Sequence, residues 1–151
     1  MAYAEKTTVS VQKSKADIEN LLKKYGANEF GYATKGNQAM VAFSMEGRKI
    51  RVLINMPVYE DLALTANGKK RTAIQIDNAY AQMERQRWRA LLLIVKAKLE
   101  AIEQGITTFE EEFMANIVLP DGRTIAETIL PQMETQYLEH GAPTLFLNDG
   151  L

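Results

Sequence analysis

The chain has 151 residues, of which 46% are hydrophobic and 25% are charged, and this composition suits a hydrophobic core of ordinary size. Because it contains no cysteine, a disulfide framework, a thiol nucleophile and any metal site with cysteine ligands are excluded. The net charge is only −1, yet residues 1–98 carry 17 Lys and Arg against 9 Asp and Glu, whereas residues 99–151 carry 1 against 10. A basic body favours an anionic partner, most often nucleic acid, and an acidic end can screen that body or meet a partner of its own.

The sequence also lacks the patterns of export and membrane insertion. The N-terminus does not have the basic and then apolar pattern of a signal peptide, and the longest aliphatic run, Ala90 to Val95, is far shorter than the roughly 20 residues that span a bilayer. We therefore expect a soluble, cytoplasmic protein that has no membrane partner.

The N-terminal part, residues 1–57, predicts a small sheet with one helix on it. The composition of residues 7–11 favours a short strand, and Ser14 is a suitable N-cap for a helix over residues 15–25 that ends at Gly26. Turns that contain glycine then separate three more segments of strand-like composition, 29–34, 38–45 and 49–56. This part is expected to form a β-α-β-β(-β) unit.

A long helix is expected after an exposed loop over residues 58–71. From Thr72 to Gln104 apolar residues recur at helical spacing in two stripes, and Trp88 in one of them is expected to be a buried anchor of the core. Such a broad apolar face needs other elements on more than one side.

Two threonines are suited to cap shorter helices in the acidic end. Thr108, with Glu111 three positions later, predicts a helix over residues 108–117. Thr124 can cap a further helix, which Pro131 interrupts or restarts.

The fold class that follows is α+β, with a small N-terminal sheet unit, a long central helix and a short helical C-terminal region. We expect a single domain over residues 1–151. Its parts are the sheet-and-helix half (1–57), the helical half (72–141) and a tail (142–151), which could add a strand or dock on another surface.

Few residues are suited to catalysis. His140 is the only histidine, and its position at a predicted helix end next to Gly141 is a sufficient structural reason for it. The consecutive glutamates at 110–112 point in different directions on a helix, so capping explains them better than metal binding. We expect no catalytic residue, no metal ion and no cofactor, and a non-enzymatic protein is favoured over an enzyme.

Basic residues on the predicted long helix could follow a phosphate backbone. Arg85 and Arg89 lie one turn apart on one side and Lys96 follows two turns later, although a solvated helix face with glutamates as neighbours explains the same pattern. Arg87 falls among apolar residues, so it should lie at the edge of the core or bind a carboxylate of the acidic end. The candidate nucleic-acid-binding residues are Arg85, Arg89, Lys96, Lys69, Lys70, Arg71, Arg48, Lys49 and Arg51.

Aromatic residues in the predicted strands allow two interpretations. Phe30, Tyr32 and Phe43 are interleaved with basic residues, as in sheets that stack the bases of a single strand. They also suit the inner face of a sheet that is half buried under the first helix, and this second interpretation is favoured.

Four stretches together resemble a block in small phage and prophage proteins of unassigned activity: RQRWRAL at 85–91, KAKLEA at 96–101, GITTFE at 105–110 and IVLPDGRT at 117–124. The stretch from Ser14 to Gly26, with Phe30, is similar to the same group. The resemblance implies a viral or prophage setting, and hence the cytoplasm of a host cell, but it implies no activity and no site residues.

Three functions follow. The first is a non-enzymatic phage or prophage accessory protein that binds nucleic acid through the basic surface. The alternative is a protein-binding module that inhibits or redirects a host factor, or contacts a phage protein, through Glu110, Glu112 and Glu139 of the acidic region. The third is a binder of a phosphorylated small molecule. The long helix is also a candidate contact for an oligomer.

Overall fold

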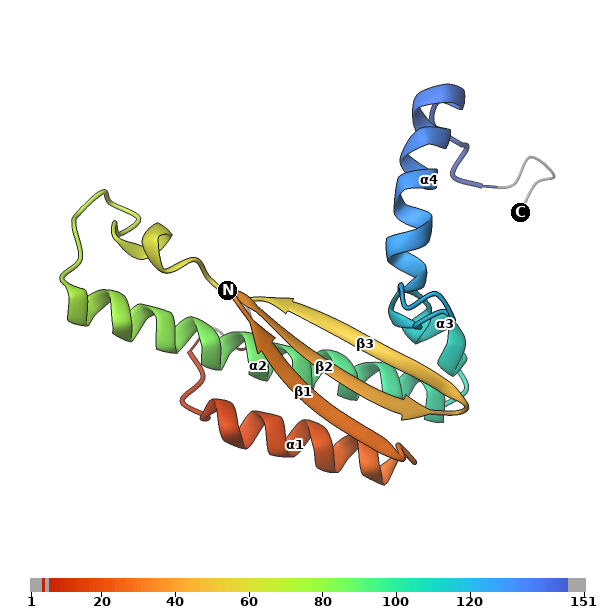
Figure 1. Cartoon of the computed structure of the whole chain (residues 1–151), viewed down its shortest axis with the longest axis horizontal. Helices are drawn as coiled ribbons and strands as arrows, with labels where there is room; N and C mark the ends of the chain where they lie inside the picture. The colour runs from red at the N-terminus through yellow and green to blue at the C-terminus, as the bar shows by residue number, and fades with distance from the viewer. Residues whose placement is uncertain (1–3, 5, 147–151) are drawn as a thin grey trace.

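Three antiparallel strands and two long helices build the body of the protein, and a helical arm of residues 105–146 leaves one end of it (Figure 1). The structure is a computed structural model and describes residues 4 and 6–146. Its elements are α1 (Val11–Lys24), β1 (Glu29–Lys35), β2 (Gln38–Met45), β3 (Arg48–Asn55), the 3₁₀ helix η1 (Tyr59–Leu62), α2 (Ala73–Glu103), α3 (Phe109–Phe113), the 3₁₀ helix η2 (Met114–Asn116) and α4 (Ile125–His140). The α+β prediction is confirmed, and the described chain starts α-β-β-β rather than β-α-β-β.

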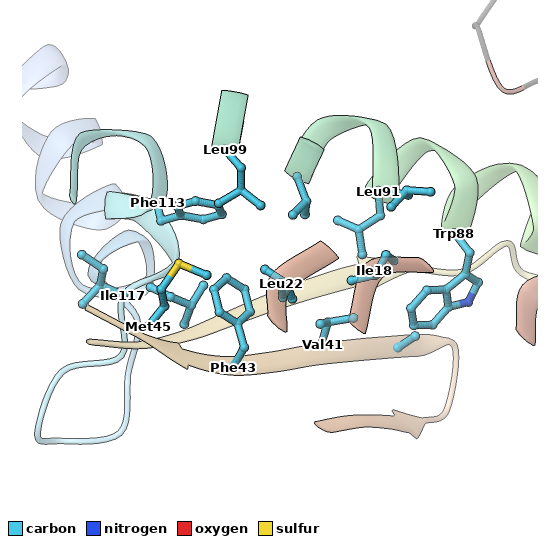
Figure 2. Packing of buried hydrophobic residues seen from close by; sticks show 14 of the residues in the cluster. Ile18, Leu22, Val41, Phe43, Met45, Trp88, Leu91, Leu99, Phe113 and Ile117 are labelled. Carbon is cyan, nitrogen blue, oxygen red and sulfur yellow. The ribbon is translucent and has the colours of Figure 1, made fainter. Parts of the chain in front are cut away.

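The sheet buries one face against the helices. Its strand order is β1-β2-β3, the register pairs Phe30 with Phe43 and Phe43 with Ile50, and the three predicted strands are confirmed to within one residue at each end. Because side chains alternate between the two faces, the buried residues of β2 are every second one, namely Ala39, Val41, Phe43 and Met45. Figure 2 shows the larger three pointing toward the helices. We call the opposite face, which has Met40 and Ala42 at its centre, the open face of the sheet.

The first helix begins four residues earlier than the sequence predicts, and the predicted cap is wrong. Ser10 is the N-cap, and its hydroxyl accepts a hydrogen bond from the backbone N–H of Lys13 at 3.1 Å. Ser14 lies inside the helix and is fully buried. The strand predicted over residues 7–11 is also wrong, because residues 7–10 form no ladder with the sheet and Val11 is already helical.

The core lies between the inner face of the sheet and the two long helices (Figure 2). Trp88 is 2% exposed, so its predicted burial is confirmed. The buried residues of α2 are Trp88, Leu91, Leu92, Val95 and Leu99. From α1, Ile18 and Leu22 fill the space beside them. The second apolar stripe of α2 is less completely covered, and its Ile94 is 52% exposed.

The arm begins with a short capped helix, as expected. The hydroxyl of Thr108 accepts a hydrogen bond from the backbone N–H of Glu111 at 3.2 Å, which confirms the cap of α3. The helix ends at Phe113 and continues only as η2, so it is shorter than the predicted 108–117. Phe109 and Phe113 are buried and extend the core.

Backbone contacts help to attach the arm to the free edge of β3. Ile117 forms an antiparallel bridge with Ile50, and the N–H of Val118 donates to the carbonyl of Lys49 at 2.8 Å. After a turn, Thr124 caps α4 with a complete capping box, as predicted. The start of α4 is therefore held beside the sheet.

Beyond its first turns α4 leaves the body (Figure 1). The interruption predicted at Pro131 is wrong, because the helix is continuous to His140 although the proline has no N–H to donate to the carbonyl of Glu127. Gly141, with φ 74°, follows the helix end as expected. Of the two alternatives for the tail, an added strand does not form over residues 142–146, and residues 147–151 lie outside the described residues.

Candidate interaction surfaces

The predicted row of phosphate-binding residues on α2 is partly used by contacts within the chain. Arg89 Nη1 lies 3.2 Å from Oδ2 of Asp17 on α1, and both side chains are less than a third exposed. Hydrogen bonds from Lys13 and from Arg89 hold the pKa of Asp17 below its usual value. Arg85 donates to a glutamine on its own helix. Of this row, Lys96 is exposed and makes no ion pair within the part of the chain that the structure describes.

Arg87 lies at the edge of the core, which was one of its two expected positions. Its Nη1 donates to the backbone carbonyl of Asn55 at the end of β3. Within residues 4 and 6–146, no carboxylate of the acidic end forms an ion pair with it. The guanidinium therefore joins α2 to the sheet instead of pairing with the arm.

In the predicted basic loop before α2, one cation is hydrogen-bonded to the loop itself and two are exposed. Arg71 Nη1 donates to the carbonyls of Leu62 and Leu64, at 3.0 and 3.1 Å, and so closes the loop that contains η1. The side chains of Lys69 and Lys70 are exposed and form no ion pair with any described residue. The two lysines are therefore available to an anion, whereas the arginine is engaged.

The basic body and the acidic end meet within one chain. Three ion pairs join them: Arg48–Glu110 at 2.9 Å, Arg51–Glu127 at 3.7 Å and Lys98–Glu112 at 3.9 Å. Lys49 pairs with Glu29 on the sheet at 2.8 Å, and this contact lowers the pKa of the Glu29 carboxyl. All three predicted sheet cations are thus paired. Of the three glutamates predicted to bind a partner, Glu139 is the one outside these pairs, and it lies on α4 beside His140.

The aromatic residues of the sheet belong to its inner face. Phe43 is buried, Phe30 is half-buried, and Tyr32 is 51% exposed at the edge of the body. The ring of Tyr32 meets Trp88 edge-on at 6.5 Å, and Lys15 Nζ lies 4.5 Å from the centre of the tyrosine ring. This arrangement is typical of the rim of a core.

The hollow beside the β2–β3 turn offers little to a phosphorylated ligand. It has a volume of about 770 Å³ and apolar walls that include Met114 and Ile125 of the arm. Its two cations, Arg48 and Lys49, both bind carboxylates already. A phosphate would have to displace those carboxylates.

An exposed apolar surface lies on α4, and the sequence interpretation missed it. None of the residues of this helix is buried. Ile125 at its start packs against the core. The large apolar side chains beyond it are between 46% and 82% exposed: Ile129, Leu130, Met133, Tyr137 and Leu138. Four of them, Ile129, Leu130, Met133 and Tyr137, lie along one side because they recur three or four positions apart, and we call them the apolar stripe. That spacing is visible in the sequence, but spacing alone does not show whether the apolar side is covered. The long helix, expected as an oligomer contact, also exposes Ile74 near its start.

Comparisons with known proteins give no information about this surface. No protein-family profile, no curated protein and no solved structure matches the chain. Among residues 4 and 6–146, no helix is long and apolar enough to cross a membrane, and no group of three or more His, Asp or Glu is placed to hold a metal ion.

Proposed function

We propose that the chain is a non-enzymatic protein-binding module and that α4 is the element that contacts the partner. The observation that carries this proposal is a helix of 16 residues without a single buried residue and with an apolar stripe along one side. Helices of this length are marginal in water unless an apolar face is packed, and exposed apolar patches of soluble proteins mark interaction sites. A partner surface over the stripe would supply the missing packing.

The side chains of α4 indicate which kind of partner surface the helix would bind. The helix carries Glu127, Glu134 and Glu139 but no Lys or Arg. A helix of this kind suits a shallow apolar surface that has cations at its rim, with anchors at positions i, i+4 and i+8. The viral setting that the sequence block implies makes a host or phage protein the class of partner to test first.

This proposal keeps the acidic region as the contact but moves the contact residues. Glu110 and Glu112 are engaged with Arg48 and Lys98, so they are poorly available, whereas Glu139 borders the exposed helix. The apolar stripe provides the binding energy, and the glutamates provide orientation and selectivity.

Photo-crosslinking in producing cells tests the proposal directly. A photoreactive amino acid at Met133, in the stripe, should give a discrete protein adduct on irradiation. The same amino acid at Thr135, on the opposite side of the helix, is the matched control and should give little. Equal yields at both positions, or no adduct at Met133, would refute a protein-binding role for α4.

Nucleic-acid binding is the second candidate, and the free lysines support it. Lys69, Lys70 and Lys96 are exposed and unpaired within the described part of the chain, and residues 1–98 keep an excess of eight positive charges. The ion pairs of Arg48, Arg51 and Arg89 weaken this candidate, because those groups must be released before they can bind phosphate.

The salt dependence of oligonucleotide binding tests whether these lysines contact phosphates. Replacing Lys69 and Lys70 with glutamine should make the slope of log affinity for oligonucleotides against log salt concentration shallower by about 1–2. The reason is that each phosphate contact releases counterions on binding, and a lost contact no longer does so. Absence of oligonucleotide binding by the folded full chain at low salt would end this candidate.

A further inference from the structure

The open face of the sheet has the chemistry that the proposed partner of α4 requires. The pairing register places these residues on the face that points away from α1 and α2: Glu29, Gly31, Ala33 and Lys35 of β1; Gln38, Met40, Ala42 and Ser44 of β2; Lys49, Arg51, Leu53 and Asn55 of β3. The centre is apolar and small, and the outer strands carry three cations against one carboxylate. Lys49 already pairs with Glu29 and Arg51 with Glu127, so Lys35 is the cation of this face without an ion pair to any described residue. Figure 1 shows no described helix lying across this face.

The middle of this face is hollowed. A depression of about 360 Å³ has Gly31, Met40 and Ala42 among its lining residues, with Lys49 and Arg51 on one side. Its floor accepts apolar side chains, because small residues on two neighbouring strands leave room for them. On its cationic side, Lys49 pairs with Glu29 and Arg51 with Glu127.

The dimensions of α4 match the face. At about 1.5 Å per residue, its 16 residues form a rod about 24 Å long. The strands have 7 or 8 residues and are about 23–26 Å long at roughly 3.3 Å per residue. Three strands spaced about 4.8 Å apart span about 10 Å, close to the diameter of one helix. One helix of this length can therefore cover this sheet.

The α4 of the same chain does not cover it. The bridge between Val118 and Thr124, and the hydrogen bond from the Ile125 N–H to the Ile117 carbonyl at 2.9 Å, fix the direction in which the helix leaves the sheet edge. Only its first turn reaches a cation of the open face, through the Arg51–Glu127 pair. Leu130 of the stripe and Leu53 of the open face line one hollow at this edge, whereas Met133 and Tyr137 do not line it.

We infer that the apolar stripe of α4 lies across the open face of a second copy of this chain, and that the exchange is reciprocal. This inference rests on the proposed role of α4 as a protein contact. Ile129, Met133 and Tyr137 cover the apolar centre, while Glu134 and Glu139 face cations such as Lys35 at the rim. A two-fold axis makes each copy both donor and acceptor, so one dimer covers both unpartnered faces.

Charge favours this arrangement over a direct pairing of two α4 helices. Each α4 has three glutamates and no Lys or Arg, so two of them side by side would bring like charges together. On the open face the same glutamates meet a surface of net positive charge, in which Lys35 forms no ion pair with any described residue. The existing Arg51–Glu127 contact shows the pairing of residue types that the exchange would repeat along the helix.

Four variants of the full chain test this inference by sedimentation equilibrium. Met133→Glu places a carboxylate in the stripe, and Ala33→Glu places one on the open face at an exposed edge strand. Thr135→Glu is the control for Met133→Glu, and Thr34→Glu is the control for Ala33→Glu. Each control adds the same charge to the same element, but on its opposite side. The wild type and both controls should dimerise, and each of the other two should dimerise about tenfold or more weakly.

An equimolar mixture of Met133→Glu and Ala33→Glu is the decisive sample. Their heterodimer keeps one unaltered contact, so the mixture should associate more tightly than either variant alone. A monomeric wild type would overturn the inference. A dimer that Ala33→Glu leaves intact would also overturn it, and would indicate that two α4 helices pair with each other. A dimer that Met133→Glu leaves intact would overturn it as well. Circular dichroism and Trp88 emission should match the wild type in every variant.

Photo-crosslinking of the otherwise unaltered full chain does not depend on the folding of the charged variants. It also separates this inference from the proposed function. The photoreactive amino acid at Met133 should give an adduct of two copies, with the crosslink mapped to residues 29–55. An adduct with a different protein would overturn the exchange but support the protein-binding role of α4. No adduct would overturn both.

Discussion

Replacement of Trp88 tests whether the core is centred where the structure places it. The indole is 2% exposed and lies among buried residues of α1, α2 and the sheet. Truncation of a buried tryptophan to alanine costs about 3–5 kcal/mol, as the sum of lost burial and a residual cavity. Because its neighbour Tyr32 is half exposed and can move into the space, we expect Trp88→Ala to lose about 3 kcal/mol, at the lower end of that range.

Urea unfolding followed by far-ultraviolet circular dichroism measures this loss, since the variant has no other tryptophan to report by fluorescence. A domain of this size has a total stability of about 5–15 kcal/mol, so the midpoint should fall clearly. Ile94→Ala is the matched control: it truncates an apolar residue of the same helix that is 52% exposed, and it should change stability by less than about 1 kcal/mol.

Two results would refute this reasoning. One is a loss below about 1 kcal/mol for Trp88→Ala, which would mean that the side chain is not buried in solution. The other is emission of the native protein at the wavelength of fully hydrated indole, because Trp88 is the sole source of that signal.

Three further predictions concern single groups. Thr108→Ala removes the cap of α3 and should lower stability by about 0.5–2 kcal/mol in thermal melting, whereas a loss of partner binding at unchanged melting would place Thr108 in a site. Ser14→Ala removes a buried hydroxyl that has no hydrogen-bond partner among the described residues, so stability should rise by about 1 kcal/mol; a lower melting temperature would show that the hydroxyl is satisfied. The pKa of Asp17 is lowered by Lys13 and Arg89, so its contribution is present at neutral pH and is lost as the pH falls through the folded-state pKa. Asp17→Asn should therefore destabilise the protein at pH 7 but not in strong acid, and an equal effect at both pH values would contradict this assignment.

The local signals of the sequence were sufficient for most elements. Alternation of apolar residues and glycine turns predicted β2 at its observed bounds, and Thr108 and Thr124 were identified as caps because capping depends on residues three positions apart. The same local reasoning misplaced the start of α1, since Ser10 and Ser14 are both acceptable caps and only packing distinguishes them. Ser14 lies inside the helix, because its N–H donates to the carbonyl of Ser10 at 3.0 Å and its side chain packs into the core.

The charge division along the chain and the amphipathic spacing of its helices were determined by the sequence alone. Tertiary structure decided which charges and which faces remain free. Arg48 and Glu110 are 62 positions apart, and their pairing depends on how the arm attaches to the edge of β3. The spacing of the apolar stripe of α4 is typical of the buried side of an amphipathic helix. The stripe is exposed because the Val118–Thr124 bridge directs the helix away from the sheet. Spacing specifies an apolar side, but only the path of the chain determines whether anything covers it.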